Sequence, residues 1–586
     1  LAYASERDGN WNIFTATIAR EEDPNFPNAT LIDEKPLFKD NKIDRAYPQY
    51  SPDGKELAFV EGRCRLMVLN LASGKVRQIT DGTQHFNTAG GIDYKWSPDG
   101  KWFALSYTGN RHDPYSDIGI VSAQGGEIFN ITNTGYFSSN PQWVLDGNAL
   151  LFKTDRYGMR SHASWGSLED VMIVFLNRKS HELFRMSKEE FELYEEAEKK
   201  AKADQAKAAE AEKSNDKKDS KKGEVKKEEP KSKDIEIEFE GIDRRIVRLT
   251  PYSGNVSGYT LSKDNKSLYY IISLEGSYDL WQITLHDRSN KVVQKSFGSG
   301  ALGWDKKREN MFQLGGSMKR FKGGSPASGT TISARCELKF NPAEEREYMF
   351  DRIYRQEKER FYTTTMHGVD WDAMCKNYAQ FLPYIDNNYD FAEMLSEWLG
   401  ELNVSHTGGR YRSTSTGDAT ASLGLLYDFT HKGNGLKVAE VLEKGPFDRA
   451  SSKVEAGCIV TKINGTEITA SQDYAQLLNG LTKKKTLITI SNPATGETFD
   501  EVILPISASA QNQLLYDRWI KQRAADVEKW SGGRLGYVHI QSMADDSFRK
   551  VYSDILGKYN HCEGIVIDTR WNGGGRLHED IEILFS

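Results

Sequence analysis

The sequence has little cysteine, and this shortage argues against two common ways of stabilising a chain. Five cysteines are spread over 586 residues, with no Cys-x-x-Cys pair and no spacing typical of zinc ligands. We therefore expect neither a disulfide framework nor a metal site, and nothing in the sequence indicates another cofactor. Buried free thiols are expected at all five positions, which are Cys64, Cys336, Cys375, Cys458 and Cys562.

The sequence also lacks long apolar runs and an excess of one charge. No apolar stretch reaches the length that spans a bilayer, so membrane insertion is not expected. The formal net charge of -7 at pH 7 is spread over both signs and gives no basic footprint for nucleic acid. These absences predict a soluble protein without a nucleic-acid partner.

The length predicts several domains. A chain of 586 residues with 38% hydrophobic residues can fill three or four cores of ordinary size. The sequence opens on Leu1 rather than methionine and shows no signal-peptide pattern. We expect that a natural N-terminus precedes Leu1, which leaves the compartment open.

A repeat occupies the first half of the sequence. The phrase PQYSPDGKELAFV, residues 48–60, returns as YKWSPDGKWFALS at 94–106 and as PQWVLDGNALLFK at 141–153. Each copy has an aromatic residue, a turn of the Ser-Pro-Asp-Gly type and an alternating strand. The turn aspartates, 46 and 47 residues apart, are Asp53, Asp99 and Asp146. Weaker copies at 259–271 and 302–314 extend the pattern, which predicts an all-β propeller over residues 1–338 that is incomplete at its N-terminus.

A charged insert interrupts this repeat at about residues 187–233. The segment consists mostly of lysine, glutamate and alanine and has almost no large apolar residues. Such a composition cannot bury enough surface to offset the entropy of ordering. We predict a solvated charged helix that runs into a disordered loop, and the alternative is an interaction arm.

A helical pattern follows over residues 339–415, where apolar and aromatic residues recur every three or four positions. It ends in the phrase ELNVSHTGGRY, residues 401–411, which places Ser405 and His406 in a glycine loop. Taken alone, this Ser-His pair is either an ordinary helix end or half of a nucleophilic catalyst.

Strand signals return over residues 421–508. The phrase KVEAGCIVTKINGTEI, residues 453–468, resembles the core of PDZ domains, with Cys458 in place of the usual aspartate. The resemblance implies binding of an extended peptide at a sheet edge, with Gly424, Leu425 and Leu426 as the binding loop. The alternative is a PDZ-like domain that serves only as a structural brace.

The last segment, residues 509–586, has the order strand, helix, strand. RLGYVHIQSM and GIVIDTRWNGGG are the two strands, and they predict a parallel pair in an α/β core with functional groups after the second strand, which we expect to be buried. The pattern Asp-x-Arg-x-Asn-x-Gly-Gly resembles the signature of C-terminal-processing serine peptidases. Its residues here are Asp568, Arg570, Asn572, Gly574 and Gly575.

The order of these four parts resembles the tricorn protease family. The resemblance implies that His406 is the general base with Ser405 beside it, and that the loop Gly573–Gly575 supplies a backbone donor for the oxyanion. It places the nucleophile and the relay acid downstream of Ser586, so neither is in the chain and we expect no peptidase activity from the sequence as given.

The resemblance favours a serine endopeptidase or oligopeptidase that acts on peptides or unfolded polypeptides. It further implies a homo-oligomer in the cytoplasm, with the periplasm as the alternative. Two other functions remain open on the sequence. One is a non-catalytic scaffold that binds peptides through a propeller and a PDZ domain, and the other is a periplasmic partner-binding propeller of the TolB type.

Overall fold

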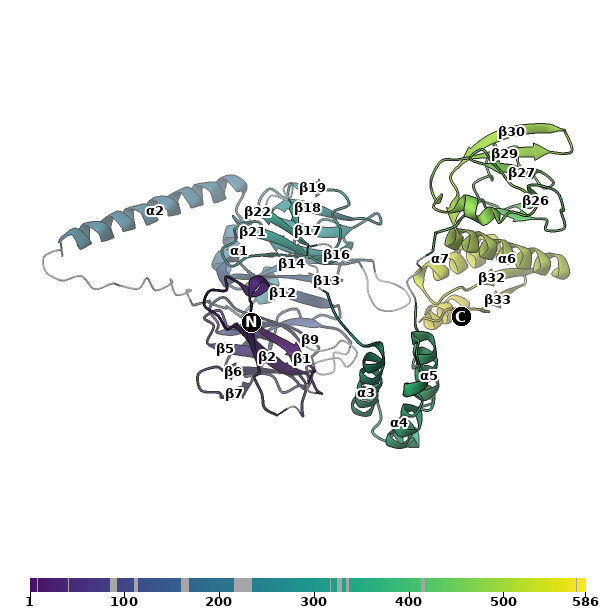
Figure 1. Cartoon of the computed structure of the whole chain (residues 1–586). Helices are drawn as coiled ribbons and strands as arrows, with labels where there is room; N and C mark the ends of the chain where they lie inside the picture. The colour runs from purple at the N-terminus through teal and green to yellow at the C-terminus, as the bar shows by residue number, and fades with distance from the viewer. Residues whose placement is uncertain are drawn as a thin grey trace. The chain divides into compact units, whose positions relative to one another are not determined.

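The computed structural model divides the chain into two compact units, which are described separately below (Figure 1). The first contains residues 1–333 with 543–548 and 574–586, and the second contains residues 334–542 with 549–573. The residues described are 1–7, 9–40, 42–84, 92–109, 114–159, 168–215, 234–316, 318–323, 329–333, 337–412, 417–575 and 577–586.

Within the described part of residues 1–333, six antiparallel sheets follow one another, and in each sheet consecutive strands pair. The first three sheets contain β1 (Ala2–Ser5), β2 (Asn12–Ile18), β3 (Ile32–Pro36); β4 (Arg45–Tyr50), β5 (Glu56–Glu61), β6 (Arg65–Asn70), β7 (Val76–Gln78); and β8 (Asp93–Trp96), β9 (Trp102–Tyr107), β10 (Asp117–Ser122), β11 (Phe129–Asn130). The next three contain β12 (Ser138–Val144), β13 (Ala149–Thr154), β14 (Asp170–Phe175), β15 (Ile246–Arg248); β16 (Asn255–Leu261), β17 (Ser267–Ser273), β18 (Tyr278–Thr284), β19 (Asn290–Gln294); and β20 (Ala301–Trp304), β21 (Asn310–Leu314), β22 (Lys319–Lys322), β23 (Gly329–Thr331).

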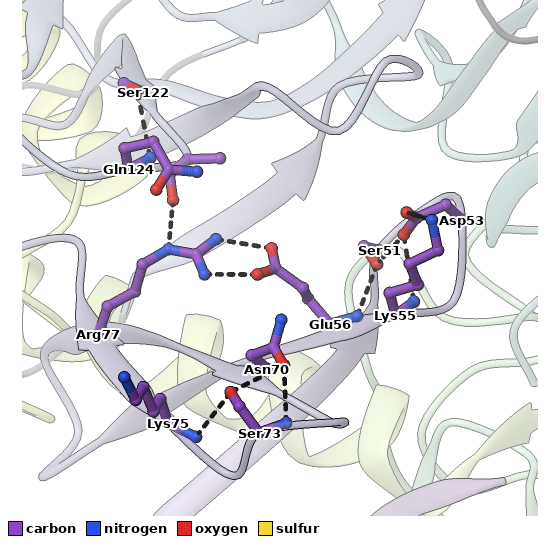
Figure 2. A network of polar contacts seen from close by, with 11 residues as sticks. Ser51, Asp53, Lys55, Glu56, Asn70, Ser73, Lys75, Arg77, Ser122 and Gln124 are labelled. Atoms are coloured by element: carbon purple, nitrogen blue, oxygen red, sulfur yellow. Dashed lines mark hydrogen bonds and ion pairs between the residues drawn. The ribbon is translucent and has the colours of Figure 1, made fainter.

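The repeated Ser-x-Asp turn joins the first two strands of a sheet by side-chain hydrogen bonds (Figure 2). Ser51 Oγ donates to the Asp53 carboxylate at 2.7 Å, and the same carboxylate accepts the Lys55 N–H at 3.1 Å. Ser51 Oγ in turn accepts the Glu56 N–H at 3.0 Å. The bond from Ser51 holds the pKa of Asp53 below its ordinary value. The same three bonds recur at residues 97–102 and 262–267.

The third copy of the repeat closes its turn differently, because Val144 stands in place of the serine whose hydroxyl makes two of these bonds in the other copies. Leu145 and Asp146 both adopt left-handed backbone angles, with φ of 53° and 54°. They begin a short 3-10 turn, Leu145–Gly147, between β12 and β13. The turn position is therefore kept although its side-chain bonding differs.

Indole groups connect successive sheets through their first strands. In three places a tryptophan near the end of one first strand donates its N–H to a carbonyl in, or at the end of, the first strand of the preceding sheet. The pairs are Trp96 with Gln49 (3.2 Å), Trp143 with Lys95 (3.1 Å) and Trp304 with Leu261 (2.9 Å). The first strands therefore lie beside one another from sheet to sheet.

An arginine makes a second kind of link between sheets, at a fourth strand. The Arg77 guanidinium, on β7, pairs with both oxygens of Glu56 at 2.5 and 2.6 Å (Figure 2). Its Nε donates to the Ala123 carbonyl, which follows β10 of the next sheet, at 2.8 Å. A bidentate arginine–carboxylate pair of this kind fixes the relative orientation of the two side chains as well as contributing energy.

The charged insert lies between β14 and β15, which pair in one sheet. It follows α1 (Arg178–Arg185) and contains α2 (Lys188–Asn215), so the predicted charged helix is confirmed. The rest of the insert, 216–233, lies outside the described residues. The first turns of α2 contact the fifth sheet, where Phe191 stacks on His286 at 4.1 Å and Glu195 pairs with Lys266 at 2.7 Å. From there α2 runs away from the sheets (Figure 1).

The second unit begins with the predicted helices, α3 (Pro342–Arg360), α4 (Trp371–Ala379) and α5 (Asn388–Gly400). Each helix has an Asn or Asp N-cap whose side chain accepts a backbone N–H. The helices pack around the fully buried Trp398, whose ring stacks on Phe350 at 4.2 Å and on Trp371 at 4.6 Å. The aromatic residues that gave the helical period therefore form this core.

A small β-rich part follows. Its main sheet has the order β25 (Leu425–Tyr427), β26 (Leu436–Val441), β27 (Ile459–Ile463), β29 (Thr486–Asn492), β30 (Glu497–Ile503), and β28 (Thr466–Glu467) pairs with β27. Its two ends are tied together by β24 (Ala421–Ser422) and β31 (Ile506–Ser507). Strands β25 and β30 are the two edges of the main sheet.

The prediction of free thiols is confirmed for the four cysteines that the structure describes, but the prediction that they are buried is mostly wrong. Of the four cysteines that the structure describes, only Cys458 is buried, in the core of this β-rich part. Cys64, Cys375 and Cys562 are half-buried, because they lie next to turns or on helix surfaces. Cys336 lies outside the described residues.

The chain closes with α6 (Ala508–Ser531), β32 (Leu535–His539), α7 (Asp545–Ser553), a π-helical turn at Asp554–Lys558, β33 (Gly564–Asp568) and α8 (His578–Phe585). Strands β32 and β33 are parallel, as predicted. The expectation that β33 is buried is wrong, because among the described strands it pairs with β32 alone, and Val566 and Ile567 are 37% and 40% exposed. No helix in the described chain is both long and apolar enough to cross a membrane.

The indole links between sheets predict a measurable contribution to stability. Trp143→Phe keeps a ring but leaves the Lys95 carbonyl without its donor, so we expect about 1 kcal/mol less unfolding free energy. Denaturant unfolding of the whole chain measures the difference. Trp530→Phe, at a side chain that is 78% exposed on α6, is the control and should leave the transition unchanged. Equal losses in the two variants would contradict the role of the indole N–H.

Candidate active site

The Ser-His pair lies in a tight turn after α5. Ser405 and His406 are both exposed, and His406 adopts a left-handed backbone with φ of 66°. The loop returns to the helix where Ser396 Oγ accepts the Gly409 N–H and donates to the Gly409 carbonyl, both at 2.9 Å. A left-handed non-glycine residue costs on the order of 1 kcal/mol and persists only where its surroundings fix it. The loop therefore holds the His406 imidazole at the surface of the unit.

The aspartate and arginine of the signature form a compact ion pair at the end of β33. Arg570 Nε lies 2.9 and 3.0 Å from the two oxygens of Asp568, and its Nη2 also contacts this carboxylate. The Arg570 backbone N–H donates to the carboxylate at 2.9 Å, and the Tyr537 hydroxyl donates at 2.7 Å. Asp568 is only 7% exposed. This arrangement holds the Asp568 carboxylate in place rather than leaving it free to act as an acid or base.

The electrostatics of the pair agree with its geometry. The Arg570 guanidinium holds the pKa of Asp568 well below its ordinary value, so the carboxyl stays ionised at neutral pH. Burial raises the pKa of Tyr537, whose hydroxyl therefore stays a donor. Asp568 is thus suited to organise the loop that follows it, not to exchange protons.

Hydrogen bonds join that loop to the end of β32. His539 Nε2 lies 2.9 Å from the Arg570 carbonyl oxygen, and Asn572 Nδ2 donates to the Ile540 carbonyl at 2.7 Å. The Gly573 N–H donates to the Gln541 carbonyl at 3.0 Å, so in this conformation Gly573 is committed to the loop. Of the three glycines predicted to supply an oxyanion donor, this one already has an acceptor.

The next two positions require glycine because of their backbone conformation. Gly574 and Gly575 have φ of 84° and 134°. A Cβ at Gly575 would come within 2.2 Å of the Met543 carbonyl oxygen, while the Met543 N–H donates to the Gly574 carbonyl at 2.9 Å. Only glycine permits this approach. The oxyanion role of Gly574 and Gly575 remains a prediction.

Sequence reasoning missed an aromatic group around the signature loop. Trp519, on α6, faces the Arg570 guanidinium at 5.2 Å from its ring centroid and meets the His539 ring edge-on at 5.2 Å. Tyr537 and His539 alternate on β32, and this alternation was a signal available in the sequence. Trp571, in the loop itself, is 76% exposed and adopts φ of 59°.

The predicted peptide-binding loop of the β-rich part lies at a sheet edge. Gly424 has φ of 68°, and a Cβ there would come within 2.6 Å of the Pro446 Cδ. Leu425 is a core residue at 3% exposure, and Leu426 is half-buried. Among the described strands of its sheet, β25 pairs only with β26, which leaves its outer edge for another strand.

Two family models match the chain. The tricorn protease C1 domain matches residues 342–400, which contain α3 to α5, and peptidase family S41 matches residues 534–586, which contain β32, β33 and the signature loop. The two matches lie on either side of the β-rich part.

Individual proteins of the tricorn type match most of the chain. Tricorn protease homolog 1 of Streptomyces coelicolor is 23% identical over 564 residues, which are 90% of this chain and 50% of the relative. The tricorn protease homolog of Saccharolobus solfataricus is 20% identical over 569 residues, which are 92% and 48% of the two chains. The crystal structure of the tricorn protease has the same fold, with a TM-score of 0.70 at 15% identity over 99% of this chain and 54% of that one. This chain thus spans about half the length of the relatives it matches.

The lowered pKa of Asp568 predicts a pH-dependent effect of removing its partner. A carboxyl with a depressed folded-state pKa adds stability above its ordinary pKa of about 4 and loses it as the pH falls toward the folded-state value. We expect Arg570→Met to unfold more easily than wild type at pH 7, and the difference to shrink below about pH 4. Urea unfolding at both pH values measures it. Tyr537→Phe, which removes a weaker contributor, should show a smaller difference, and a pH-independent difference would contradict the ionic origin.

Proposed function

Because the chain belongs to the tricorn protease family, we propose that it is part of a serine endopeptidase or oligopeptidase that degrades peptides. The observation that carries this proposal is that the chain has both loops, each next to or inside a family match. An exposed Ser-His turn lies within seven residues of the C1 match, and the Asp568–Arg570 loop lies inside the S41 match. A pure binding protein would have no use for either.

In this proposal His406 is the general base and Ser405 supports it. Attack on a peptide carbonyl needs a serine activated by an imidazole that titrates near neutral pH. The exposure of His406 leaves its ring open to such a partner. The nucleophilic serine and the relay acid lie outside residues 1–586, and the backbone at Gly574 and Gly575 would stabilise the oxyanion.

The domain assignment follows the sequence boundaries. We assign residues 1–338 to a β-propeller, 339–415 to the first part of the protease core, 421–508 to a PDZ-like domain and 509–586 to the start of the second part. The six consecutive sheets and the indole links between their first strands support the propeller, because radially arranged blades pack through their inner strands. The open edge of β25 supports peptide binding by strand addition in the PDZ-like domain.

Peptides or unfolded polypeptides are the proposed substrates. Assembly into a homo-oligomer and a cytoplasmic location, with the periplasm as the alternative, rest on the family resemblance alone.

Labelling with a fluorophosphonate tests the peptidase. In a protein extended to include the downstream serine, wild type should label on that serine and His406→Ala should label at least ~10²-fold more slowly. His431→Ala, at a half-buried histidine of the β-rich part, is the control and should label like wild type. A folded wild type that never labels would exclude the peptidase.

A peptide titration tests the edge of β25. We expect a fluorescent peptide with a free C-terminal carboxylate to bind the chain and its amidated form to bind about 10-fold more weakly. Leu426→Arg, at the proposed edge, should lower the affinity. The control is Val502→Arg, because Val502 is 50% exposed on β30, the opposite edge of the same sheet. Equal losses in both variants, or equal affinity for both peptides, would favour the structural brace.

A further inference from the structure

Each loop of the proposed peptidase site is held by a histidine that also contacts a tyrosine hydroxyl. In the helical part, His367 Nδ1 lies 2.9 Å from the Leu402 carbonyl oxygen, and its Nε2 contacts the Tyr362 hydroxyl. At β32, His539 Nε2 lies 2.9 Å from the Arg570 carbonyl oxygen, and its Nδ1 contacts the Tyr516 hydroxyl. The same three groups occur in both places, with the ring nitrogens exchanged.

The contacts determine which nitrogen carries the proton. A carbonyl oxygen can only accept, so the nitrogen that faces it must be the donor. His367 is therefore protonated on Nδ1 and His539 on Nε2. In a neutral ring the opposite nitrogen is the acceptor, and the tyrosine hydroxyl beside it is the donor. Burial raises the pKa of Tyr516 to about 12, so this hydroxyl keeps its proton at neutral pH.

Aromatic neighbours hold both rings in place. Phe361 meets the His367 ring edge-on at 5.2 Å with an angle of 80° between the ring planes. Trp519 meets the His539 ring at 5.2 Å and 88°. His539 is 6% exposed, whereas His367 lies at the surface, so the bond at His539 is the better shielded of the two.

The two accepting carbonyls lie at the start of the proposed functional segments. Leu402 is fully buried in the helical core and precedes Ser405 by three positions. Arg570 directly precedes the exposed Trp571 and the glycine loop. A hydrogen bond at each carbonyl fixes the point from which the loop departs. Such fixing matters because a catalytic group that is misplaced by about 1 Å can lower the rate about 10²-fold.

We propose that His367 and His539 are positioning residues that tether the two loops of the peptidase site through opposite ring nitrogens. His367 acts on the loop that carries Ser405 and His406, and His539 acts on the loop that carries the glycines. Neither is proposed to touch the substrate. This inference rests on the proposed peptidase function and adds two residues to it.

The opposite tautomers allow a crossed test, because the two amide side chains replace different ring nitrogens. The amide nitrogen of asparagine reaches about as far as Nδ1, and that of glutamine about as far as Nε2. His367→Asn and His539→Gln should therefore keep the tethers, whereas His367→Gln and His539→Asn should break them. In the protein extended to include the nucleophile, we expect the second pair to lower kcat about 10-fold with KM within about 2-fold, and the first pair to stay within about 3-fold of wild type.

Three results would overturn the proposal. Equal kcat for Asn and Gln at either position would show that the donor position is irrelevant. A loss of thermal stability with unchanged kcat would reduce the histidines to a structural role. The reverse preference, Gln at 367 and Asn at 539, would contradict the tautomers.

A measurement without activity separates this proposal from the proposed function. Ring ¹⁵N chemical shifts of histidine-labelled chain 1–586 distinguish the two tautomers, and His367→Ala and His539→Ala assign the signals. We expect Nδ1–H at His367 and Nε2–H at His539. If wild type neither labels nor hydrolyses peptides but shows these tautomers, the peptidase fails while the tethers stand; the opposite tautomers would exclude the tethers.

Discussion

The buried carboxylate of Asp568 is the fixed point on which the signature loop depends. Two arginine side-chain nitrogens, one backbone N–H and one tyrosine hydroxyl all point at it, so the charge of this nearly buried carboxylate is compensated on several sides. The parallel pairing of β32 and β33 brings Tyr537 to this position. Because Arg570 is held at both its side chain and its carbonyl, the residues after it have little freedom.

Each loop of the proposed site contains an exposed residue with a strained backbone. His406 and Trp571 are non-glycine residues in left-handed conformations, and both are exposed. Each lies a few residues from a carbonyl that a histidine binds, at Leu402 and at Arg570. Strain of this kind persists where tertiary contacts over-determine the backbone, and it is common at functional sites. The strain and the tethers therefore belong to one arrangement.

The sheets of the first unit show how a short repeat can build a large domain. In three copies a serine and an aspartate close the turn between two strands, and indole N–H groups join one sheet to the previous one. Each sheet thus needs only its neighbours, which explains how the long insert between β14 and β15 is accommodated without breaking the pairing of these strands.

The sequence by itself determined the repeating turns, the helical period around Trp398 and the parallel strands before the glycines, because all three depend on contacts between residues close in the chain or on a regular pattern. It also predicted Asp568 and Arg570, which lie two positions apart. Only the tertiary structure decided that His539 and Trp519 complete the same cluster and that β33 has an exposed face. These outcomes depend on which distant segments pack together, and no local pattern records that choice.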